Sequence, residues 1–328
     1  MLPTASTTIL IAGFGSIGRR HFRNLRELGY ERFVFLRTRR GSLDDAEIAA
    51  WPSVHSVEEA LAHRPSVAVI ANPSALHVPV ALAAAEAGCA LFVEKPLSDS
   101  LSGCEQLLTV VRQKKLTTMI GCQFRFHPLT IALRNALLEG RLGSPLGAEA
   151  EWGEYLPAWH PWENYRESYS ARKELGGGVV LTLIHPLDYL FWLFGRTRRI
   201  TGTTRPVPAL KTPAGEDWAD MLLEFADGGV VARVHLDYWQ RPPVHRLSVW
   251  GEQGTAKIDF HAGTLHYQMV DGTTASEKVP EGFERNAMFL DEMRHFLECC
   301  HAGQPSSIPL EEGIAVLEMA LEARKVDG

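Results

Sequence analysis

Short apolar runs alternate with segments of helical periodicity over the first 125 residues of the chain. We expect strands in TTILIA, RFVFL, SVAVIANP, ALFV and TTMIGC. Between them, apolar residues recur every three or four positions, which predicts helices after residue 16, after Ser56, over 77–88 and over 101–115. Strands that alternate with helices in this way are typical of βαβ units, so we predict an α/β domain with a doubly wound parallel sheet. The ligand of such a sheet lies at the carboxyl ends of the strands.

The pattern changes near residue 145. The segments that follow alternate apolar and polar residues between glycine-containing turns, which predicts antiparallel strands with one buried face. Two helices, expected over 286–303 and 310–325, close the chain. We therefore expect a first domain over residues 1–124 and an α+β domain over residues 125–328, built on a large, open, mainly antiparallel sheet. Because these helices are too few to cover both faces of that sheet, we also expect a homodimer or homotetramer that assembles through it.

Composition and charge narrow the class of protein. Of the 328 residues, 45% are hydrophobic and 22% are charged, as in ordinary globular proteins. A formal net charge of -6 argues against nucleic acid as a partner. No apolar run reaches about 18 residues, and no basic segment precedes the N-terminal apolar stretch, so we expect no membrane span and no signal peptide. The 5 cysteines form no C-x-x-C pair, which favours reduced thiols in a cytoplasmic protein.

A glycine-rich turn joins the first strand to the first helix. It has the pattern G-x-G-x-x-G and consists of Gly13, Phe14, Gly15, Ser16, Ile17 and Gly18. In this position the turn lets backbone N–H groups approach a dinucleotide pyrophosphate at the positive end of the helix. After the second strand stand Arg37, Thr38 and Arg39, with no carboxylate before Asp44. Guanidinium groups match a 2′-phosphate, so NADP(H) is the favoured cofactor and NAD is the other possibility. An exposed basic turn without a ligand would give the same pattern.

Several segments together resemble the Gfo/Idh/MocA oxidoreductases. They occur in the family's order and spacing and read GFGSIGRRH, VAVIANPSALH, LFVEKPL, GCQFRFHP and LGGGVVLTLIHPLDYLFWLFG. The resemblance covers nearly the whole chain and implies an NAD(P)-binding Rossmann domain over 1–124. It also implies a substrate-binding and oligomerisation domain over 125–328. The subgroup that the chain resembles most is found with surface-polysaccharide and nonulosonic acid pathways, which implies a sugar or sugar-nucleotide substrate whose hydroxyl or keto group exchanges a hydride.

The resemblance also implies roles for individual residues. Asn72, Pro73 and His77 would border the cofactor, Glu94 and Lys95 would lie near the nicotinamide, Gln123 and Arg125 would form the floor of the cleft, and His185 would face the substrate carbon. These residue types suit the chemistry, because oxidising an alcohol removes a hydride from carbon and a proton from oxygen. A histidine is a ready base near neutral pH, and a lysine that donates to the same oxygen stabilises developing alkoxide. We therefore expect Lys95 and His185 to be catalytic.

One position departs from the family pattern. The family commonly has an aspartate shortly before the histidine, where this chain has Thr182, so Asp188 is a candidate for part of that role. His185 could also simply begin a helix before Pro186. Arg166 and Tyr169 are further candidates for lining the substrate site, and no histidine spacing supports a metal site. Two alternatives to a dehydrogenase stay open: a cofactor-binding sensor that has lost catalysis, and a redox-neutral lyase or glycosidase that uses bound NAD.

Overall fold

The chain forms two compact units. The computed structural model describes residues 6–37, 46–159 and 163–325. The first unit comprises Met1–Cys122 and Arg285–Leu317, and the second comprises Gln123–Glu284 and Glu318–Gly328. The first division lies close to the boundary expected at residue 124, but the units are not the two contiguous stretches that we expected. Helix α8 (Arg285–Ala302) belongs to the first unit because it packs against α1 (Ser16–Glu27) and β6 (Thr118–Gly121).

The first unit contains a parallel sheet of six strands in the order β3-β2-β1-β4-β5-β6, which confirms the doubly wound fold. Its strands are β1 (Thr8–Ala12), β2 (Arg32–Leu36), β3 (Ser53–Val54), β4 (Val67–Ile70), β5 (Ala90–Glu94) and β6. All residues of β4 are buried, as an apolar run in a doubly covered sheet requires. The short β3 was not expected, because two residues carry no periodicity.

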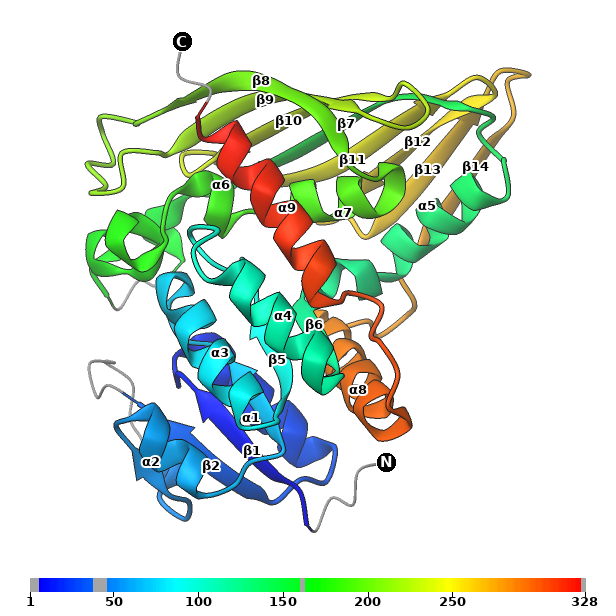
Figure 1. Cartoon of the computed structure of the whole chain (residues 1–328). Helices are drawn as coiled ribbons and strands as arrows, with labels where there is room; N and C mark the ends of the chain where they lie inside the picture. Colours follow the sequence, from blue (N-terminus) through cyan, green and yellow to red (C-terminus); the bar gives the residue numbers. More distant parts are fainter. Residues whose placement is uncertain (1–5, 38–45, 160–162, 326–328) are drawn as a thin grey trace. The chain divides into compact units, whose positions relative to one another are not determined.

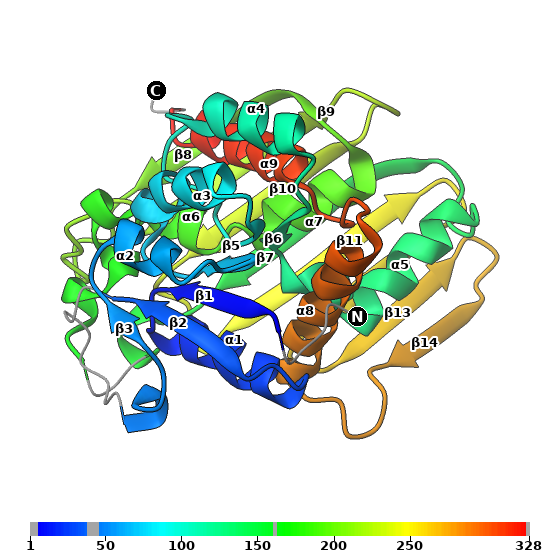
Figure 2. The same cartoon turned by 60° about the horizontal axis from the view of Figure 1, so that its bottom comes forward.

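Helices cover both faces of this sheet (Figures 1 and 2). Helix α3 (His77–Glu86) packs beside α4 (Cys104–Lys114) on one side, and α1 packs beside α8 on the other. The remaining elements are α2 (Val57–Ala62), the start of α9 (Leu310–Ala323) and the short 3-10 turns η1 (Ala46–Ile48) and η2 (Ser74–Leu76). Helix α2 begins with a capping box in which Ser56 and Glu59 bond each other's backbone N–H groups, as the S-x-x-E spacing predicts.

The second unit is built on eight strands in the order β14-β13-β12-β11-β7-β10-β9-β8. The strands are β7 (Pro145–Gly153), β8 (Thr197–Arg205), β9 (Trp218–Phe225), β10 (Val231–Asp237), β11 (Val244–Gly251), β12 (Gly254–Asp259), β13 (Thr264–Met269) and β14 (Thr274–Lys278). All neighbours pair antiparallel except β7 and β10, which run parallel. The mainly antiparallel sheet is therefore confirmed, and the carboxyl ends of β7 and β10 meet at one edge.

Helices pack on one face of this sheet only, among the residues that the structure describes (Figure 1). They are α5 (Pro128–Leu138), α6 (Val179–Thr182) and α7 (His185–Phe194), with short turns η3 (Gln123–Phe126), η4 (Leu156–Ala158), η5 (Tyr165–Glu167), η6 (Tyr169–Ala171) and η7 (Lys173–Leu175). The strand residues on this face, such as Ala150 and Leu223, are buried. Their neighbours on the other face are polar, such as Glu149 and Arg233, which form an ion pair. The uncovered face is therefore not apolar, and our reason for expecting an oligomer was wrong, although the oligomer stays a prediction.

Within the described part of the chain, no single helix is long and apolar enough to span a membrane. One bent pair, Lys173–Thr182 with His185–Phe194, meets that criterion by length and composition only.

Candidate active site

The glycine-rich turn between β1 and α1 has the geometry that close backbone packing requires. Gly13 has a φ of 92°, and a Cβ there would lie 2.5 Å from the backbone nitrogen of Asn72. A Cβ on Gly18 would lie 2.2 Å from the carbonyl oxygen of Gly13. Gly15, the residue before α1, is different, because its Cβ would meet no atom within 4 Å. Gly13 and Gly18 therefore shape the turn, and the space beside Gly15 stays open at the helix N-terminus.

Arginines gather around the ring of Phe14 in this turn. The guanidinium carbon of Arg37 lies 5.7 Å from the ring centroid, and that of Arg19 lies 4.4 Å from it. Arg37 is buried rather than part of an exposed basic turn. Glu47 accepts hydrogen bonds from Arg23 and Arg19. These hydrogen bonds lower the pKa of the Glu47 carboxyl, and the bond from Arg23 has the larger effect. Thr38 and Arg39, the other two residues expected to contact a 2′-phosphate, lie outside the described residues.

His77 links two of the loops that were expected to border a cofactor. One ring nitrogen lies 2.7 Å from the carbonyl oxygen of Asn72, and the other lies 3.0 Å from that of Pro96. Burial lowers the pKa of His77, so its ring is neutral near pH 7. The loop of Asn72 and Pro73 follows β4, and the loop of Pro96 follows β5. His77 therefore fixes two adjacent strand ends against each other, next to the turn at Gly13.

Strand β5 ends in a buried charged residue that has a partner elsewhere in the unit. Glu94 lies 2.5 Å from Nε2 of His21 on α1, and its other oxygen accepts the backbone N–H of Lys95 at 3.2 Å. Lys95 itself is only half-buried. His21 was not singled out in the sequence, although helical periodicity places it on the buried face of α1 with Gly18 and Leu25. The pair explains why a buried strand ends in a charged residue: Glu94 anchors the loop that carries Lys95.

His21, Glu94 and Glu292 are the one group of metal-ligand types in the described residues with ligand atoms close enough to share an ion. All three residues are buried. The 2.5 Å distance between His21 and Glu94 is that of a direct hydrogen bond, which uses the ligand atoms of both residues. We therefore describe His21 and Glu94 as a hydrogen-bonded pair, with Glu292 close to both.

In the second unit, two residues expected to contact the substrate form an ion pair with each other. Arg125, in η3 with the buried Gln123, donates to both carboxylate oxygens of Asp188 on α7, at distances of 2.7 to 3.1 Å. The side chains of Arg125 and Asp188 are only 2% and 1% exposed. Asp188 does lie on the helix that His185 begins, as expected, but its carboxylate is occupied by the guanidinium. This ion pair therefore joins η3 to α7.

His185 is the first residue of α7 and is held among aromatic rings. The indole of Trp152 is stacked on its imidazole at 5.5 Å, and the ring of Phe124 meets it edge-on at 4.9 Å. Trp152 also stacks on His245 at 4.1 Å and donates its indole N–H to Glu154 at 2.8 Å. These contacts come from four separate elements, so no local pattern in the sequence predicts them. They fix the plane of the His185 ring.

The other expected substrate residues are dispersed. Thr182 ends α6 and is buried. Arg166 donates to the carbonyl oxygen of Leu210 at 3.0 Å, and Tyr169 is half-buried in η6. The threonine at position 182 supplies no negative charge near His185.

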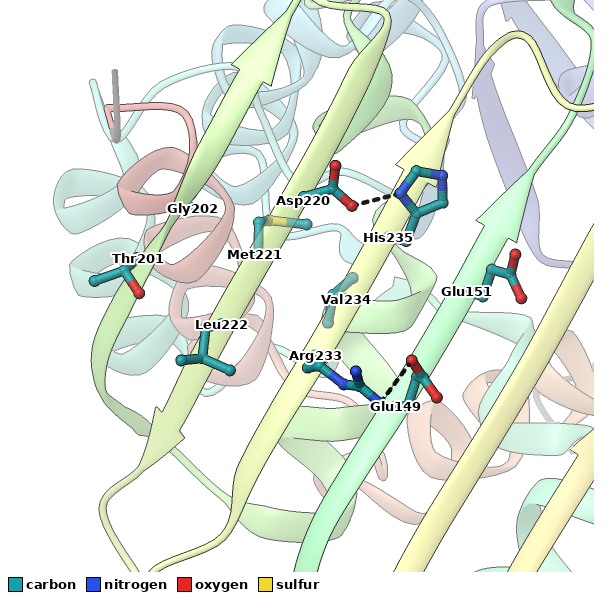
Figure 3. A pocket seen from close by; sticks show the side chains of 10 residues that line it. All are labelled: Glu149, Glu151, Thr201, Gly202, Asp220, Met221, Leu222, Arg233, Val234 and His235. Atoms are coloured by element: carbon teal, nitrogen blue, oxygen red, sulfur yellow. Dashed lines mark hydrogen bonds and ion pairs between the residues drawn. The ribbon is translucent and has the colours of Figure 1, made fainter. Parts of the chain in front are cut away.

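A concavity lies on the polar face of the large sheet (Figure 3). Its lining residues are Glu149, Glu151, Thr201, Gly202, Asp220, Met221, Leu222, Arg233, Val234 and His235. None of the expected site residues lines it. Burial lowers the pKa of His235, but hydrogen bonds to Asp237 and Asp220 outweigh that effect and raise it overall. The concavity is polar and internally paired, and it lacks the residues that hydride chemistry needs.

Comparisons with known proteins agree with the fold of the two units. A family model described as an oxidoreductase family with an NAD-binding Rossmann fold matches residues 7–122, and one described as the GFO/IDH/MocA C-terminal domain matches residues 130–257. The UDP-N-acetylglucosamine 3-dehydrogenase of Acidithiobacillus ferrooxidans is 26% identical over 323 residues, which cover 96% of this chain and 95% of that one. The scyllo-inositol 2-dehydrogenase (NAD(+)) of Bacillus subtilis is 27% identical, over 88% of this chain and 80% of that protein.

Solved structures show the same fold. The structure of the Acidithiobacillus enzyme superposes with a TM-score of 0.79 at 23% identity and covers 97% of both chains. A levoglucosan dehydrogenase in complex with NADH and levoglucosan superposes with a TM-score of 0.84 at 17% identity, over 98% of this chain and 96% of that one. With both halves matched and the parallel and antiparallel sheets in place, the chain belongs to the Gfo/Idh/MocA family of NAD-binding oxidoreductases.

Proposed function

We propose that the chain is a dehydrogenase or reductase that prefers NADP(H) and transfers a hydride to or from a hydroxyl or keto group of a sugar or sugar nucleotide. The observation that carries this proposal is the turn of Gly13, Gly15 and Gly18 at the start of α1. Its two packed glycines and its one open glycine fit a pyrophosphate at the helix N-terminus. The cofactor, when bound, supplies the atom that gains or loses the hydride.

Lys95 and His185 are the residues to which we assign the proton chemistry. The Lys95 ammonium donates a hydrogen bond to the reacting substrate oxygen and stabilises negative charge there. A ring nitrogen of His185 takes the hydroxyl proton in oxidation and returns it in reduction. The stacked Trp152 supports this role, because a base must be held at a defined orientation. Glu94, held by His21, fixes the backbone from which Lys95 extends.

The assignment of Lys95 and His185 is tested by single-turnover hydride transfer. Lys95→Ala and His185→Ala should each lower the rate by roughly 10²-fold or more, as the loss of one preorganised donor or base does. Lys95→Arg should restore little, because a guanidinium differs in shape and does not release its proton. The double variant should lose less than the product of the two effects. A near-normal rate in Lys95→Ala would leave that residue with no part in the chemistry.

The preference for NADP(H) rests on Arg37. Its guanidinium is buried over Phe14, inside the dinucleotide turn, where a 2′-phosphate would find a cation and a hydrogen-bonding fork. Arg37→Asp should weaken NADPH binding by about 2 kcal/mol or more and should change NADH binding much less, because an attraction becomes a repulsion. Calorimetry of both cofactors provides the measurement. Equal affinity of the unmodified protein for NADPH and NADH would contradict the preference.

The class of substrate is supported by relatives that are named as dehydrogenases of UDP-N-acetylglucosamine and of scyllo-inositol. A screen of free sugars, sugar phosphates and sugar nucleotides, followed at the absorbance band of reduced nicotinamide, would identify the substrate and the favoured direction. Turnover of none of these three classes, in either direction, would contradict the proposal.

A cofactor-binding sensor is a second candidate, and two observations favour it. Thr182 stands where the family commonly has an aspartate, and the carboxylate of Asp188 is occupied by Arg125. A sensor would bind NADPH with ordinary affinity and would show no hydride transfer with any sugar in the screen. Thr182→Asp offers a direct comparison: if the dehydrogenase has only been slowed, this variant should raise the rate.

A further inference from the structure

Two loops at one edge of the large sheet carry an arginine stacked on two aromatic rings. Tyr155 follows β7, and Trp239 and Arg241 follow β10, which is parallel to β7. The guanidinium carbon of Arg241 lies 4.2 Å from the ring centroid of Tyr155 and 4.5 Å from that of Trp239. The two rings meet edge-on at 5.6 Å. The three side chains therefore form one cluster, which we call the arginine platform.

The backbone beneath the arginine platform is fixed by several contacts. Asp237, fully buried at the end of β10, accepts the backbone N–H groups of Trp239 and Gln240, both at 2.6 Å. The two loops are also joined by backbone hydrogen bonds. The N–H of Glu154 donates to the carbonyl oxygen of Asp237 at 3.0 Å, and the N–H of Leu156 donates to that of Tyr238 at 3.1 Å. These hydrogen bonds hold the backbone of both loops in place beneath the arginine platform.

Gly153, the last residue of β7, allows the two loops to approach this closely. A Cβ at that position would lie 2.3 Å from a carboxylate oxygen of Asp237 and 2.5 Å from Cβ of Gln240. Any other residue would push the second loop away from the first. The close approach of Tyr155 to Trp239 therefore depends on this glycine.

Arg241 has a charge that the described part of the chain does not neutralise. Its side chain is exposed, and no carboxylate of residues 6–37, 46–159 or 163–325 lies within ion-pair distance of it. Exposed arginines nearby on the same sheet do have such partners, for example Arg246 with Asp259 at 3.2 Å. The guanidinium carbon lies over both rings, whose planes are 80° apart, and no described residue accepts a hydrogen bond from its N–H groups, so these groups can bond an anion.

The arginine platform lies close along the chain to the residue that holds His185. Trp152, which stacks on the His185 ring, is three residues before Tyr155. Three residues of extended chain span at most about 10 Å. A substrate whose reacting carbon lies at His185 could therefore carry an anionic group that reaches the platform.

We propose that Tyr155, Trp239 and Arg241 form a subsite for a phosphate group on the substrate, so that the chain acts on a sugar phosphate or a sugar nucleotide rather than on a free sugar. This inference rests on the proposed function, which it narrows. A bare sugar ring would need an open aromatic face, and here the guanidinium already occupies a face of both rings. A phosphate needs the fork of donors that the stacked guanidinium presents.

The test measures binding without turnover. N-acetylglucosamine, its 1-phosphate and UDP-N-acetylglucosamine are each titrated into the protein saturated with reduced cofactor, since an alcohol and a reduced nicotinamide do not react. Both phosphate-bearing probes should bind at least about 10-fold more tightly than the free sugar. Arg241→Gln should remove that gain and leave the affinity for the free sugar unchanged. Additional affinity for the UDP probe over the 1-phosphate would indicate that the nucleotide is also recognised.

Arg205→Gln provides a matched control. Arg205 is also exposed and also lies over an indole, that of Trp218 at 4.6 Å, but it is remote from Tyr155 in the sheet order. Its variant should bind all three probes as the unmodified protein does. Equal affinity for the three probes, or an equal loss for all three in Arg241→Gln, would overturn the subsite. Tighter binding of glucuronate than of the 1-phosphate would also overturn the subsite, because it would show a preference for a carboxylate over a phosphate.

The two proposals fail in different ways. Loss of phosphate-dependent binding in Arg241→Gln, with no hydride transfer to any sugar, would support the subsite and refute the dehydrogenase. Hydride transfer from a free sugar, with a KM that Arg241→Gln does not change, would support the dehydrogenase and refute the subsite.

Discussion

The buried ion pair of Arg125 and Asp188 should dominate the response of the second unit to mutation. Asp188→Leu removes the carboxylate and leaves the Arg125 guanidinium, which is 2% exposed, inside the protein without its counter-charge. The rings of Phe191 and Trp192, with centroids 5.9 and 5.8 Å from the guanidinium carbon, replace little of the lost interaction. Arg125→Met combined with Asp188→Leu removes both charges and keeps a similar volume.

The expected magnitudes differ sharply between these two variants. Removing one partner of a buried pair costs about 3–5 kcal/mol, because an uncompensated charge stays in a medium of low polarity. Replacing both partners by apolar residues is often neutral or stabilising, since the cost of desolvating two charges disappears with them. We therefore expect Asp188→Leu to lower the free energy of unfolding by about 3–5 kcal/mol. The double variant should lie within about 1–2 kcal/mol of the unmodified protein.

Urea denaturation followed by far-ultraviolet circular dichroism measures both effects. With a urea dependence of about 3 kcal/mol per molar, the midpoint of Asp188→Leu should fall by roughly 1 M or more. A loss below about 1 kcal/mol in Asp188→Leu, or a double variant as unstable as the single one, would refute the reasoning. If the double variant folds but its KM for the substrate rises more than about 10-fold, Arg125 or Asp188 contributes to substrate binding.

Three further perturbations test other parts of the structure. Gly15→Ala should leave the melting temperature nearly unchanged, because its Cβ meets no atom within 4 Å, yet should weaken NADPH binding in calorimetry by about 10-fold or more, since the methyl group enters the space beside the helix N-terminus. Burial lowers the pKa of His127 to about 4 in the folded protein, whereas a histidine in the unfolded chain has a pKa of about 6.5. As the pH falls below about 6.5, the unfolded chain therefore binds a proton at this residue while the folded protein does not. Through this residue alone, the free energy of unfolding should fall by about 2 kcal/mol between pH 7 and pH 5. His127→Asn keeps a side-chain cap on α5 and should remove that part of the loss, which urea titrations at both pH values would measure. Arg324→Ala should cost about 3 kcal/mol at pH 7 because it leaves Glu216 buried and charged. Burial already raises the pKa of Glu216, so protonation should make the loss smaller at pH 5, and an equal loss at both pH values would contradict this account.

The parts of the fold that local patterns determine could be predicted from the sequence. The alternation of apolar runs and helical periodicity indicated the parallel sheet, and the S-x-x-E spacing indicated the cap on α2, because both depend on residues near in the chain. The turn at Gly13 followed from its position between a strand and a helix. The direction of β10 relative to β7 did not follow, since strands that alternate in polarity look the same in parallel and antiparallel pairs.

The contacts that define the candidate site were harder to predict, because they join distant parts of the chain. His21 and Glu94 are 73 residues apart, and Arg125 and Asp188 are 63 apart. Sequence reasoning identified Glu94 by its position at a strand end, but it did not identify the residue to which it pairs. The same limit applies to Trp152, whose stacking on His185 depends on how a strand and a helix pack together.

The two arginines of the second unit illustrate how the structure redirects the search for a binding site. In the sequence, Arg125 is a candidate because it stands in a segment that resembles the family, whereas Arg241 is not singled out. The structure shows that Nε and Nη2 of Arg125 donate to Asp188, so a ligand that bound these groups would compete with a carboxylate already in place. Arg241 is oriented by two rings and carries a charge without a carboxylate partner among the described residues, so an anionic ligand displaces no carboxylate there. An anion therefore meets no competing carboxylate of the described residues at the exposed arginine, whereas it competes with Asp188 at the buried one.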